Sequence, residues 1–323
     1  MIGAGVRSGG APAVSVVLPA YNVSGYIAET LDSVFAQEFE DFEVIVVNDG
    51  SPDASALEVA IAPFRDRIIF LAQANAGPSA ARNTAIRQAR GKYLAFLDGD
   101  DLWLPHYLSD QVGRAEADPL LAVVYGDVEI IGDPTSAGKT ARELNGAIEE
   151  ANFLSLLSAR CTFTTSCAMV RRDWCEKVGL FDPALRRSED LDLWLRIANA
   201  GGRFGATTKV LAKYRRHGGG ASSDLQAMAD AKMAVMDKCE RTLTLSVEAR
   251  DAIARGRSQQ RAVKNFLTGK QAFADGDFQT ARRALSEANT VMRSRKLSLI
   301  VTGLAVAPNV LSRLYSLATA RRR

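Results

Sequence analysis

The stretch LAFLDGDDLW, residues Leu94 to Trp103, places three aspartates directly after a short apolar run. The run from Tyr93 to Leu97 has the composition of a buried strand, and Asp98, Asp100 and Asp101 follow it. Carboxylates this close repel one another, and each desolvated one costs free energy unless a partner compensates it. Capping a helix needs only one aspartate, so three of them indicate a cation site.

The segments around this stretch alternate between apolar strands and helices. Strands are predicted at residues 14–19, 42–48, 68–73, 93–97, 122–131 and 162–170. Helices are predicted after the first strand, at residues 79–89, and in a segment that stops at Gly201. Continuous apolar strands alternating with helices indicate an α/β fold, with a mostly parallel sheet and helices on both faces.

Polar residues follow three of these strands. Tyr21 and Asn22 come after the first strand, Asp49 after the second, and Asp98 to Asp101 after the fourth. In such sheets, ligands bind outside the carboxyl ends of the strands. We therefore expect these residues to converge on one rim of the sheet.

Charge divides the chain into two unequal parts. Residues 1–240 hold 24 Lys and Arg against 32 Asp and Glu, whereas residues 241–323 hold 16 against 5. A basic end suggests a role near an acidic surface such as anionic lipid. From residue 224 the chain reads as all helix, and residues 269–288 resemble one tetratricopeptide-type hairpin. The apolar and then basic segment 297–323 would lie in a membrane interface or act as a docking helix.

The remaining composition points to a reducing environment. The cysteines Cys161, Cys167, Cys175 and Cys239 form no CxxC pair, so we expect buried free thiols. Residues 1–12 are rich in Gly and Ala, are predicted to be disordered, and lack the apolar stretch of a signal peptide. No run reaches the roughly 18 apolar residues of a membrane-spanning helix. We expect a cytoplasmic protein, with peripheral contact at the inner face of the plasma membrane left open.

Asp98 and Asp100 have the spacing of a metal-binding pair. The intervening Gly99 lets the backbone come close while both side chains turn to one ion. Carboxylate oxygens suit Mg²⁺ or Mn²⁺, which in turn bridge phosphate oxygens. We therefore predict a Mg²⁺ or Mn²⁺ cofactor that neutralises a diphosphate leaving group.

Three further residues have both a functional and a structural interpretation. Asp49, in the turn NDGS, would accept a nucleobase N–H or would only shape the turn. Arg82 would approach a base or a phosphate near a helix N-terminus, or would be a surface arginine. His217, within YRRHGGGAS, would contact a diphosphate or would be satisfied within its loop. These alternatives stay open on the residues alone.

Five ordered segments of this sequence resemble the motifs of family 2 glycosyltransferases with the GT-A fold. They are SVVLPAYN, EVIVVNDGSPD, NAGPSAARNTAI, YLAFLDGDDLW and EDLDLWLRI, within about Val14 to Ser223. The resemblance implies a Rossmann-like GT-A domain over residues 13–223, followed by a helical region over 224–323 that the motifs do not cover. It also implies metal-dependent, inverting transfer of a sugar from a nucleotide diphosphate donor, with a UDP-sugar as the default, to a hydroxyl acceptor.

The resemblance gives each candidate residue a role. The nucleotide-sugar site would consist of Pro19, Tyr21, Asp49, Arg82 and Asp98. The metal site would consist of Asp100, Asp98 and His217. Asp190 would be the general base that takes the acceptor proton, and Glu189 would orient the acceptor.

The acceptor itself is not encoded in these motifs. The family-level expectation is a carbohydrate or lipid-linked glycan in cell-surface polysaccharide biosynthesis, with no nucleic-acid partner. Trp103 and Trp194 are candidates for stacking on a sugar ring, although Trp194 lies in an apolar helix and fits the core better.

Two other functions compete with sugar transfer. Nucleotidyl transfer would want a Gly-rich, lysine-bearing loop near the first strand, and SVVLPAYNVSG offers no basic residue there. A non-catalytic nucleotide-sugar-binding or scaffold protein, working through the helical tail, would not need Asp98, Asp100, Glu189 and Asp190 together.

Overall fold

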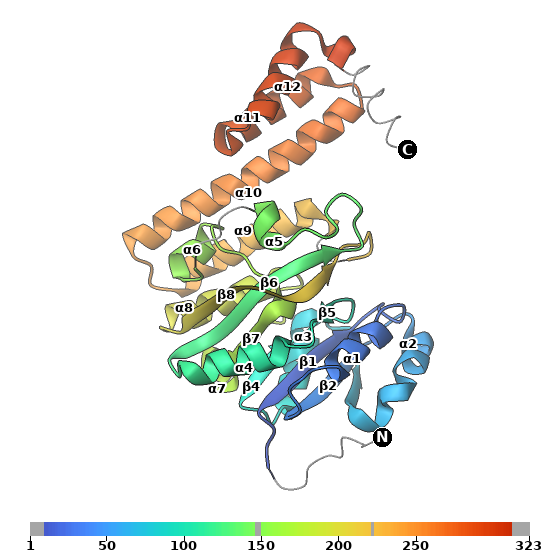
Figure 1. Cartoon of the computed structure of the whole chain (residues 1–323). Coiled ribbons are helices and arrows are strands. Elements are labelled where there is room, and N and C mark those ends of the chain that lie inside the picture. The colour runs from blue at the N-terminus through green and yellow to red at the C-terminus, as the bar shows by residue number, and fades with distance from the viewer. Residues whose placement is uncertain (1–9, 146–149, 221–222, 312–323) are drawn as a thin grey trace. The chain divides into compact units, whose positions relative to one another are not determined.

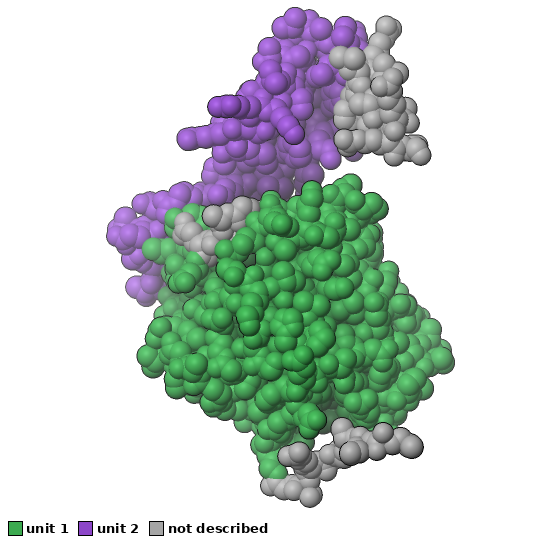
Figure 2. Space-filling view, viewed as in Figure 1, with its two compact units in different colours: residues 1–156, 160–220 green, residues 157–159, 221–323 purple. Residues whose placement is uncertain are grey.

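A computed structural model of the chain describes residues 10–145, 150–220 and 223–311. It contains two compact units, residues 1–156 with 160–220 and residues 157–159 with 221–323, coloured separately in Figure 2. The domain boundary at residues 223 and 224 remains a proposal. The predicted disordered start and the basic end of the chain fall largely on residues 1–9 and 312–323, outside the described residues.

Within the described residues, the first unit is built on one eight-stranded sheet of order β3-β2-β1-β4-β7-β6-β8-β5 (Figure 1). The strands are β1 Val14–Ala20, β2 Phe42–Asp49, β3 Ile69–Gln73, β4 Tyr93–Phe96, β5 Leu102–Trp103, β6 Leu121–Ile131, β7 Ala168–Arg171 and β8 Arg203–Arg215. Strands β1 to β4 pair in parallel, as does β6 with β8, whereas β7 runs antiparallel to β4 and β6 and β5 antiparallel to β8. The expected α/β fold is confirmed, with a mixed sheet.

Helices connect these strands. They are α1 Ile27–Phe35, α2 Ala54–Ile61, η1 Ala62–Arg67, α3 Pro78–Gln88, α4 Tyr107–Ala117, α5 Ala141–Asn145, α6 Phe153–Leu157, η2 Thr165–Cys167, α7 Arg172–Val178 and α8 Glu189–Asn199. The strand predicted at residues 162–170 is shorter than expected, because Thr165–Cys167 form a 3-10 turn before β7 begins.

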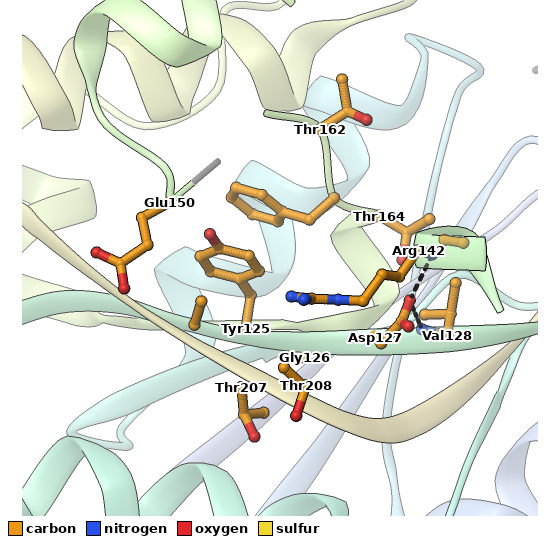
Figure 3. A pocket seen from close by; sticks show the side chains of 13 residues that line it. Tyr125, Gly126, Asp127, Val128, Arg142, Glu150, Thr162, Thr164, Thr207 and Thr208 are labelled. Atoms are coloured by element: carbon orange, nitrogen blue, oxygen red, sulfur yellow. Dashed lines mark hydrogen bonds between the residues drawn. The ribbon is translucent and has the colours of Figure 1, made fainter. Parts of the chain in front are cut away.

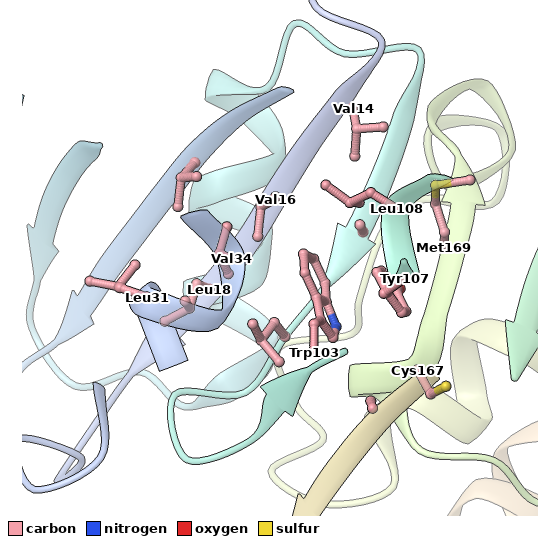
Figure 4. Close-up of a cluster of buried hydrophobic side chains, with 14 of the residues drawn as sticks. Val14, Val16, Leu18, Leu31, Val34, Trp103, Tyr107, Leu108, Cys167 and Met169 are labelled. Carbon is pink, nitrogen blue, oxygen red and sulfur yellow. The ribbon is translucent and has the colours of Figure 1, made fainter. Parts of the chain in front are cut away.

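One face of the sheet carries a large hydrophobic core. Because side chains alternate along a strand, Val14, Val16 and Leu18 of β1 point to this face, where helices α1 and α4 cover them (Figure 4). Trp103 also lies in this cluster, stacked on Tyr107 with ring centroids 4.1 Å apart. Its side chain is buried, so the structure does not support Trp103 as a platform for a sugar ring.

The opposite face is covered by other helices. Helix α3 packs on β1 and β2, and Phe96 of β4 contacts Trp194 of α8 and Phe181, which lies between α7 and α8. Trp194 is buried there, as its apolar helix predicted. The sheet therefore has helices on both faces. The four cysteines are buried thiols, as expected.

Glu43 of β2 connects β1 and the segment before β4 at the end of the sheet opposite the predicted rim. Its carboxylate accepts hydrogen bonds from Ser15 Oγ at 2.6 Å and from the Arg90 backbone N–H and Nε at 2.7 and 2.9 Å. Burial alone would raise the pKa of Glu43, but the hydrogen bonds from Ser15 and Arg90 lower it below its ordinary value.

Glu43→Gln is expected to lower the free energy of unfolding at neutral pH by about 1.5–3 kcal/mol, because charge-assisted hydrogen bonds are lost. The lowered pKa stabilises the fold above the ordinary carboxyl pKa, and this contribution disappears as pH falls through the pKa of the folded state. Denaturant unfolding at several pH values measures the difference in unfolding free energy between wild type and variant. Tryptophan fluorescence reports on it, since Trp103, Trp174 and Trp194 all lie in the first unit. A difference between wild type and variant that persists unchanged in acid would contradict this assignment.

The second unit consists of helices in its described part: α9 Leu225–Thr242, α10 Val247–Ala274, α11 Phe278–Met292 and α12 Arg295–Val306. The predicted hairpin is present as α10 and α11, joined through Gly276 at φ 80° and capped by Asp277, which accepts a hydrogen bond from Thr280 N. Leu285 of α11 packs against Gly269 of α10, where a Cβ would lie 2.6 Å from Leu285 Cγ. Among the described residues, no helix combines the length and apolar character that a membrane crossing requires.

Candidate active site

Four segments that are distant in sequence meet beyond the carboxyl end of β4. They are the acidic segment after β4, helix α3, the start of α8, and the loop that follows β8. Asp98 and Asp100 come from the first segment, and Arg82, Glu189 and His217 from the others. The segment closely approaches the start of α1 and the turn before it, since a Cβ on Gly99 would lie 2.9 Å from Val23 Cγ2 and 3.3 Å from Ile27 Cδ1. The glycine of DGD is therefore needed for this close packing.

Arg82 joins two of these segments through a buried double ion pair. Its two terminal nitrogens lie 2.5 Å from Asp98 Oδ1 and 2.5 Å from Glu189 Oε1. Burial alone would lower the pKa of Arg82, but the charges of Asp98 and Glu189 raise it above its ordinary value. Burial raises the pKa of Glu189, which Arg82 only partly opposes. The guanidinium thus fixes the position of Asp98 relative to the start of α8.

Helix α3 owes its position to Asp49, which ends β2. The Asp49 carboxylate accepts hydrogen bonds from Gln73 Nε2 at 2.7 Å and from the N–H groups of Ala76 and Gly77 at 2.9 and 2.8 Å. Gly77 has φ 91°, and Pro78 begins the helix. Asp49 therefore shapes the loop that leads to Arg82, in agreement with its structural interpretation.

Asp100 and His217 face each other across the site. Asp100 Oδ2 lies 2.9 Å from His217 Nε2, and the imidazole ring packs against Tyr26 with centroids 5.0 Å apart. Burial, together with the charge of Asp98, raises the pKa of Asp100 above its ordinary value. The negative charge at Asp100 is thus incompletely compensated by its neighbours.

Asp101 serves the fold of the acidic segment. It is buried, accepts a hydrogen bond from Ser166 Oγ at 2.5 Å, and accepts another from Arg215 N at 2.8 Å. Ser166 Oγ also accepts the Asp98 N–H at 3.1 Å, and Arg215 Nε donates to the Asp100 carbonyl at 2.8 Å. Ser166 and Arg215 therefore hold the DGDD backbone from two sides.

The three carboxylates at the start of α8 have different partners. Glu189 pairs with Arg82, while Asp192 is buried and pairs with Arg196 at 2.7 Å within the helix. Asp190 accepts hydrogen bonds from Thr165 Oγ1 at 3.0 Å and from Leu191 N at 2.8 Å. These two donors orient the Asp190 carboxylate, which forms no ion pair with the residues that the structure describes.

The proposed nucleotide side of the site lies at the ends of β1 and β2. Pro19 and Asn48 lie in these two paired strands, and Tyr21 follows β1 with half of its surface exposed. Asn22, at φ 55°, donates its N–H to Ser51 Oγ at 2.6 Å. The arrangement leaves the Tyr21 side chain accessible. The nucleotide-binding roles of Pro19, Tyr21, Asp49, Arg82 and Asp98 stay predictions.

The metal prediction can be compared with the donor atoms present. Across the described ranges, no group of three or more His, Cys, Asp and Glu side chains is arranged to hold a metal ion. Asp98 is already bound by Arg82, which leaves Asp100 and His217 as a facing oxygen and nitrogen donor. Two protein donors suffice for an ion that takes its other ligands from substrate phosphates and water. A divalent cation would stabilise the negative charge of Asp100, whose pKa is raised by burial and by Asp98. These residues therefore fit such an ion.

Comparison with known proteins identifies the family. The model of glycosyl transferase family 2 matches residues 15–179. The chain belongs to glycosyl transferase family 2. The chain is 30% identical over 208 residues to the uncharacterized glycosyltransferase RP339 of Rickettsia prowazekii, and the alignment covers 64% of each chain. It is 35% identical over 185 residues to the uncharacterized glycosyltransferase EpsJ of Bacillus subtilis, covering 55% of this chain and 54% of EpsJ.

The aligned parts span 31% to 64% of the length of the Rickettsia relatives. Solved structures show the same fold. The mannosyltransferase PcManGT of Pyrobaculum calidifontis, in complex with GDP-Man and Mn²⁺, superimposes with a TM-score of 0.63 at 21% identity, over 96% of this chain and 84% of its own. S. aureus TarS 1-349, in complex with UDP-GlcNAc, superimposes with a TM-score of 0.62 at 17% identity, over 94% of this chain and 92% of the TarS chain. The GT-A-like fold is thereby confirmed.

Sequence reasoning missed the residues that support the site. Thr165 and Ser166 hold Asp190 and the acidic segment, and Arg215 anchors the segment from β8. The sequence did contain a signal for Thr165 and Ser166, which is the polar run TTS just before an apolar strand. Hydroxyl groups at the end of a strand can lie at the same edge of the sheet as the aspartates and bond to them.

Proposed function

We propose that this protein is a metal-dependent, inverting glycosyltransferase that moves a sugar from a nucleotide diphosphate donor to a hydroxyl acceptor. The observation that carries the proposal is the meeting of Asp98, Asp100, Arg82, Glu189 and His217 beside the oriented carboxylate of Asp190. A protein that only binds a nucleotide sugar has no use for an oriented base next to a cation site.

The chain's own residues divide the work of binding and proton transfer. Tyr21 and the end of β1 would receive the nucleoside, with a UDP-sugar as the default donor. Asp100 and His217 would hold Mg²⁺ or Mn²⁺, with Asp98 fixed beside them by Arg82. When bound, this cation supplies charge stabilisation to the diphosphate leaving group.

The chemical step we propose is a single displacement. Asp190 takes the proton of the acceptor hydroxyl, and the acceptor oxygen bonds to the anomeric carbon as the bond from that carbon to the diphosphate oxygen breaks. Attack from the side opposite the leaving group inverts the anomeric configuration. Glu189, held by Arg82, orients the acceptor beside Asp190.

We further propose that the acceptor is a carbohydrate or lipid-linked glycan of cell-surface polysaccharide synthesis, handled at an anionic membrane surface on the cytoplasmic side. Helix α12 supports contact with a membrane, since Leu299 and Val306 are 74% and 80% exposed. The basic residues Arg295 and Lys296 begin this helix, and Arg293 lies just before it. Apolar area beside basic charge favours anionic lipid.

The proposed function is tested by incubating the full chain with UDP-sugars and GDP-sugars and Mn²⁺. Release of the nucleoside diphosphate from one donor, abolished by EDTA and restored by added Mn²⁺, is expected. An inverted product identified by NMR would establish the stereochemistry. The proposal would be overturned if the folded protein, with Mn²⁺ present, neither bound nor turned over any nucleotide sugar.

A further inference from the structure

A cavity of about 300 Å³ lies in the first unit, between β6, β8 and the segment that leads to Thr164 (Figure 3). Its volume is at the lower end of the range for small-molecule sites, which suits one sugar residue better than a nucleotide sugar. None of the predicted donor-site residues lines it. The described cavity therefore has no role in the donor site described above.

The lining combines hydroxyl groups with an aromatic pair. The rings of Tyr125 and Phe163 stack with centroids 4.1 Å apart, and both residues line the cavity. Thr162, Thr164 and Thr208 add hydroxyl groups. Sugars present both C–H faces, which pack on aromatic rings, and hydroxyl groups, which need hydrogen-bond partners. This lining matches both properties.

Two polar groups of the lining lack partners among the described residues. The Thr164 hydroxyl oxygen is buried and makes no hydrogen bond there. A buried polar atom without a protein partner is uncommon and indicates a missing partner such as water or a ligand. The exposed Arg142 side chain, which Figure 3 shows extending toward Tyr125, also lines the cavity and forms no ion pair within the described ranges.

A residue that lines the cavity directly precedes, in the chain, a residue that orients the proposed base. Thr164 lines the cavity, and the following residue, Thr165, donates its hydroxyl to Asp190 Oδ2 at 3.0 Å. A ligand bound to Thr164 would therefore be close to the group that takes a proton from the acceptor. We propose that this cavity is the acceptor subsite and binds one sugar residue through Thr164, Arg142 and the Tyr125–Phe163 pair. This inference rests on the proposed function.

Saturation-transfer NMR of the full chain with a panel of methyl glycosides of common hexoses and N-acetylhexosamines tests the proposal, with and without UDP and Mn²⁺. At least one glycoside is expected to bind, and Arg142→Ala and Thr164→Val are each expected to weaken its binding about tenfold. The matched changes Arg87→Ala, on exposed α3 surface, and Thr242→Val, in α9, are expected to leave it unchanged.

Thermal unfolding separates a ligand-binding role from a structural one. Thr164→Val should keep the melting temperature of wild type, because its hydroxyl has no described partner to lose, and both cavity variants should still bind UDP. Glycoside binding that survives both cavity changes, or no glycoside binding by a wild type that binds UDP, would overturn the acceptor subsite and leave the donor site standing. A wild type that binds glycosides through the cavity but binds no nucleotide would instead overturn the proposed function.

Discussion

Asp190→Asn is expected to lower kcat for sugar transfer about 10²–10⁴-fold, because the amide cannot take the acceptor proton. The substitution keeps the size of the side chain and an oxygen that can accept the Leu191 N–H. Binding of UDP with Mn²⁺ should stay within about twofold of wild type, since no donor-site residue bonds to Asp190. Steady-state kinetics and calorimetry measure the two effects separately.

Two further changes control this experiment. Asp173→Asn removes a carboxylate in the first turn of α7 that pairs with Arg171 of β7, and it should leave kcat unchanged. Thr165→Ala removes a donor that orients Asp190 and should lower kcat less than Asp190→Asn does. Full transfer activity in Asp190→Asn would show that another group accepts the proton.

Arg82→Met is expected to lower the free energy of unfolding of the first unit by about 3–5 kcal/mol. The change leaves Asp98 and the nearly buried Glu189 without their shared cation, and an uncompensated buried charge is costly. Arg87→Met on the same helix is the matched control, and a change within about 0.5 kcal/mol is expected at this exposed position. Denaturant unfolding followed by tryptophan fluorescence compares the two variants.

The double variant Arg82→Met with Glu189→Gln identifies the origin of the effect. Removing the Glu189 charge should recover part of the lost stability, which a loss of packing alone would not allow. Equal unfolding free energies for Arg82→Met and Arg87→Met would contradict a buried ion pair between α3, the acidic segment and α8.

The sequence allowed prediction of the elements that carry a regular apolar pattern. Strands such as Val14–Ala20 and Phe42–Asp49 are continuous apolar runs, and their parallel pairing follows from the helices between them. The antiparallel insertion of β7 between β4 and β6 was not predictable, because strand order depends on long-range pairing. The cavity was not predictable for the same reason, because its lining comes from five separate stretches of the chain.

The candidate site shows a similar division. The acidic residues after β4 and at the start of α8 were identifiable because carboxylates at strand and helix ends are chemically conspicuous. Their pairing was not, since Arg82 reaches two carboxylates that are 16 and 107 residues away. The positions of the supporting hydroxyl groups Thr165 and Ser166 likewise depend on how β7 enters the sheet.

Calorimetric titration of UDP into the full chain tests the central claim most directly, with Mn²⁺ present, with the metal removed by EDTA, and in the variant Asp100→Asn with Mn²⁺. Asp100 is the carboxylate that faces His217, and its exchange for an amide removes the charge that would attract the cation. We predict binding in the first case and affinity at least about tenfold weaker in the other two. UDP binding of equal strength in all three cases would contradict a metal-dependent donor site at Asp100.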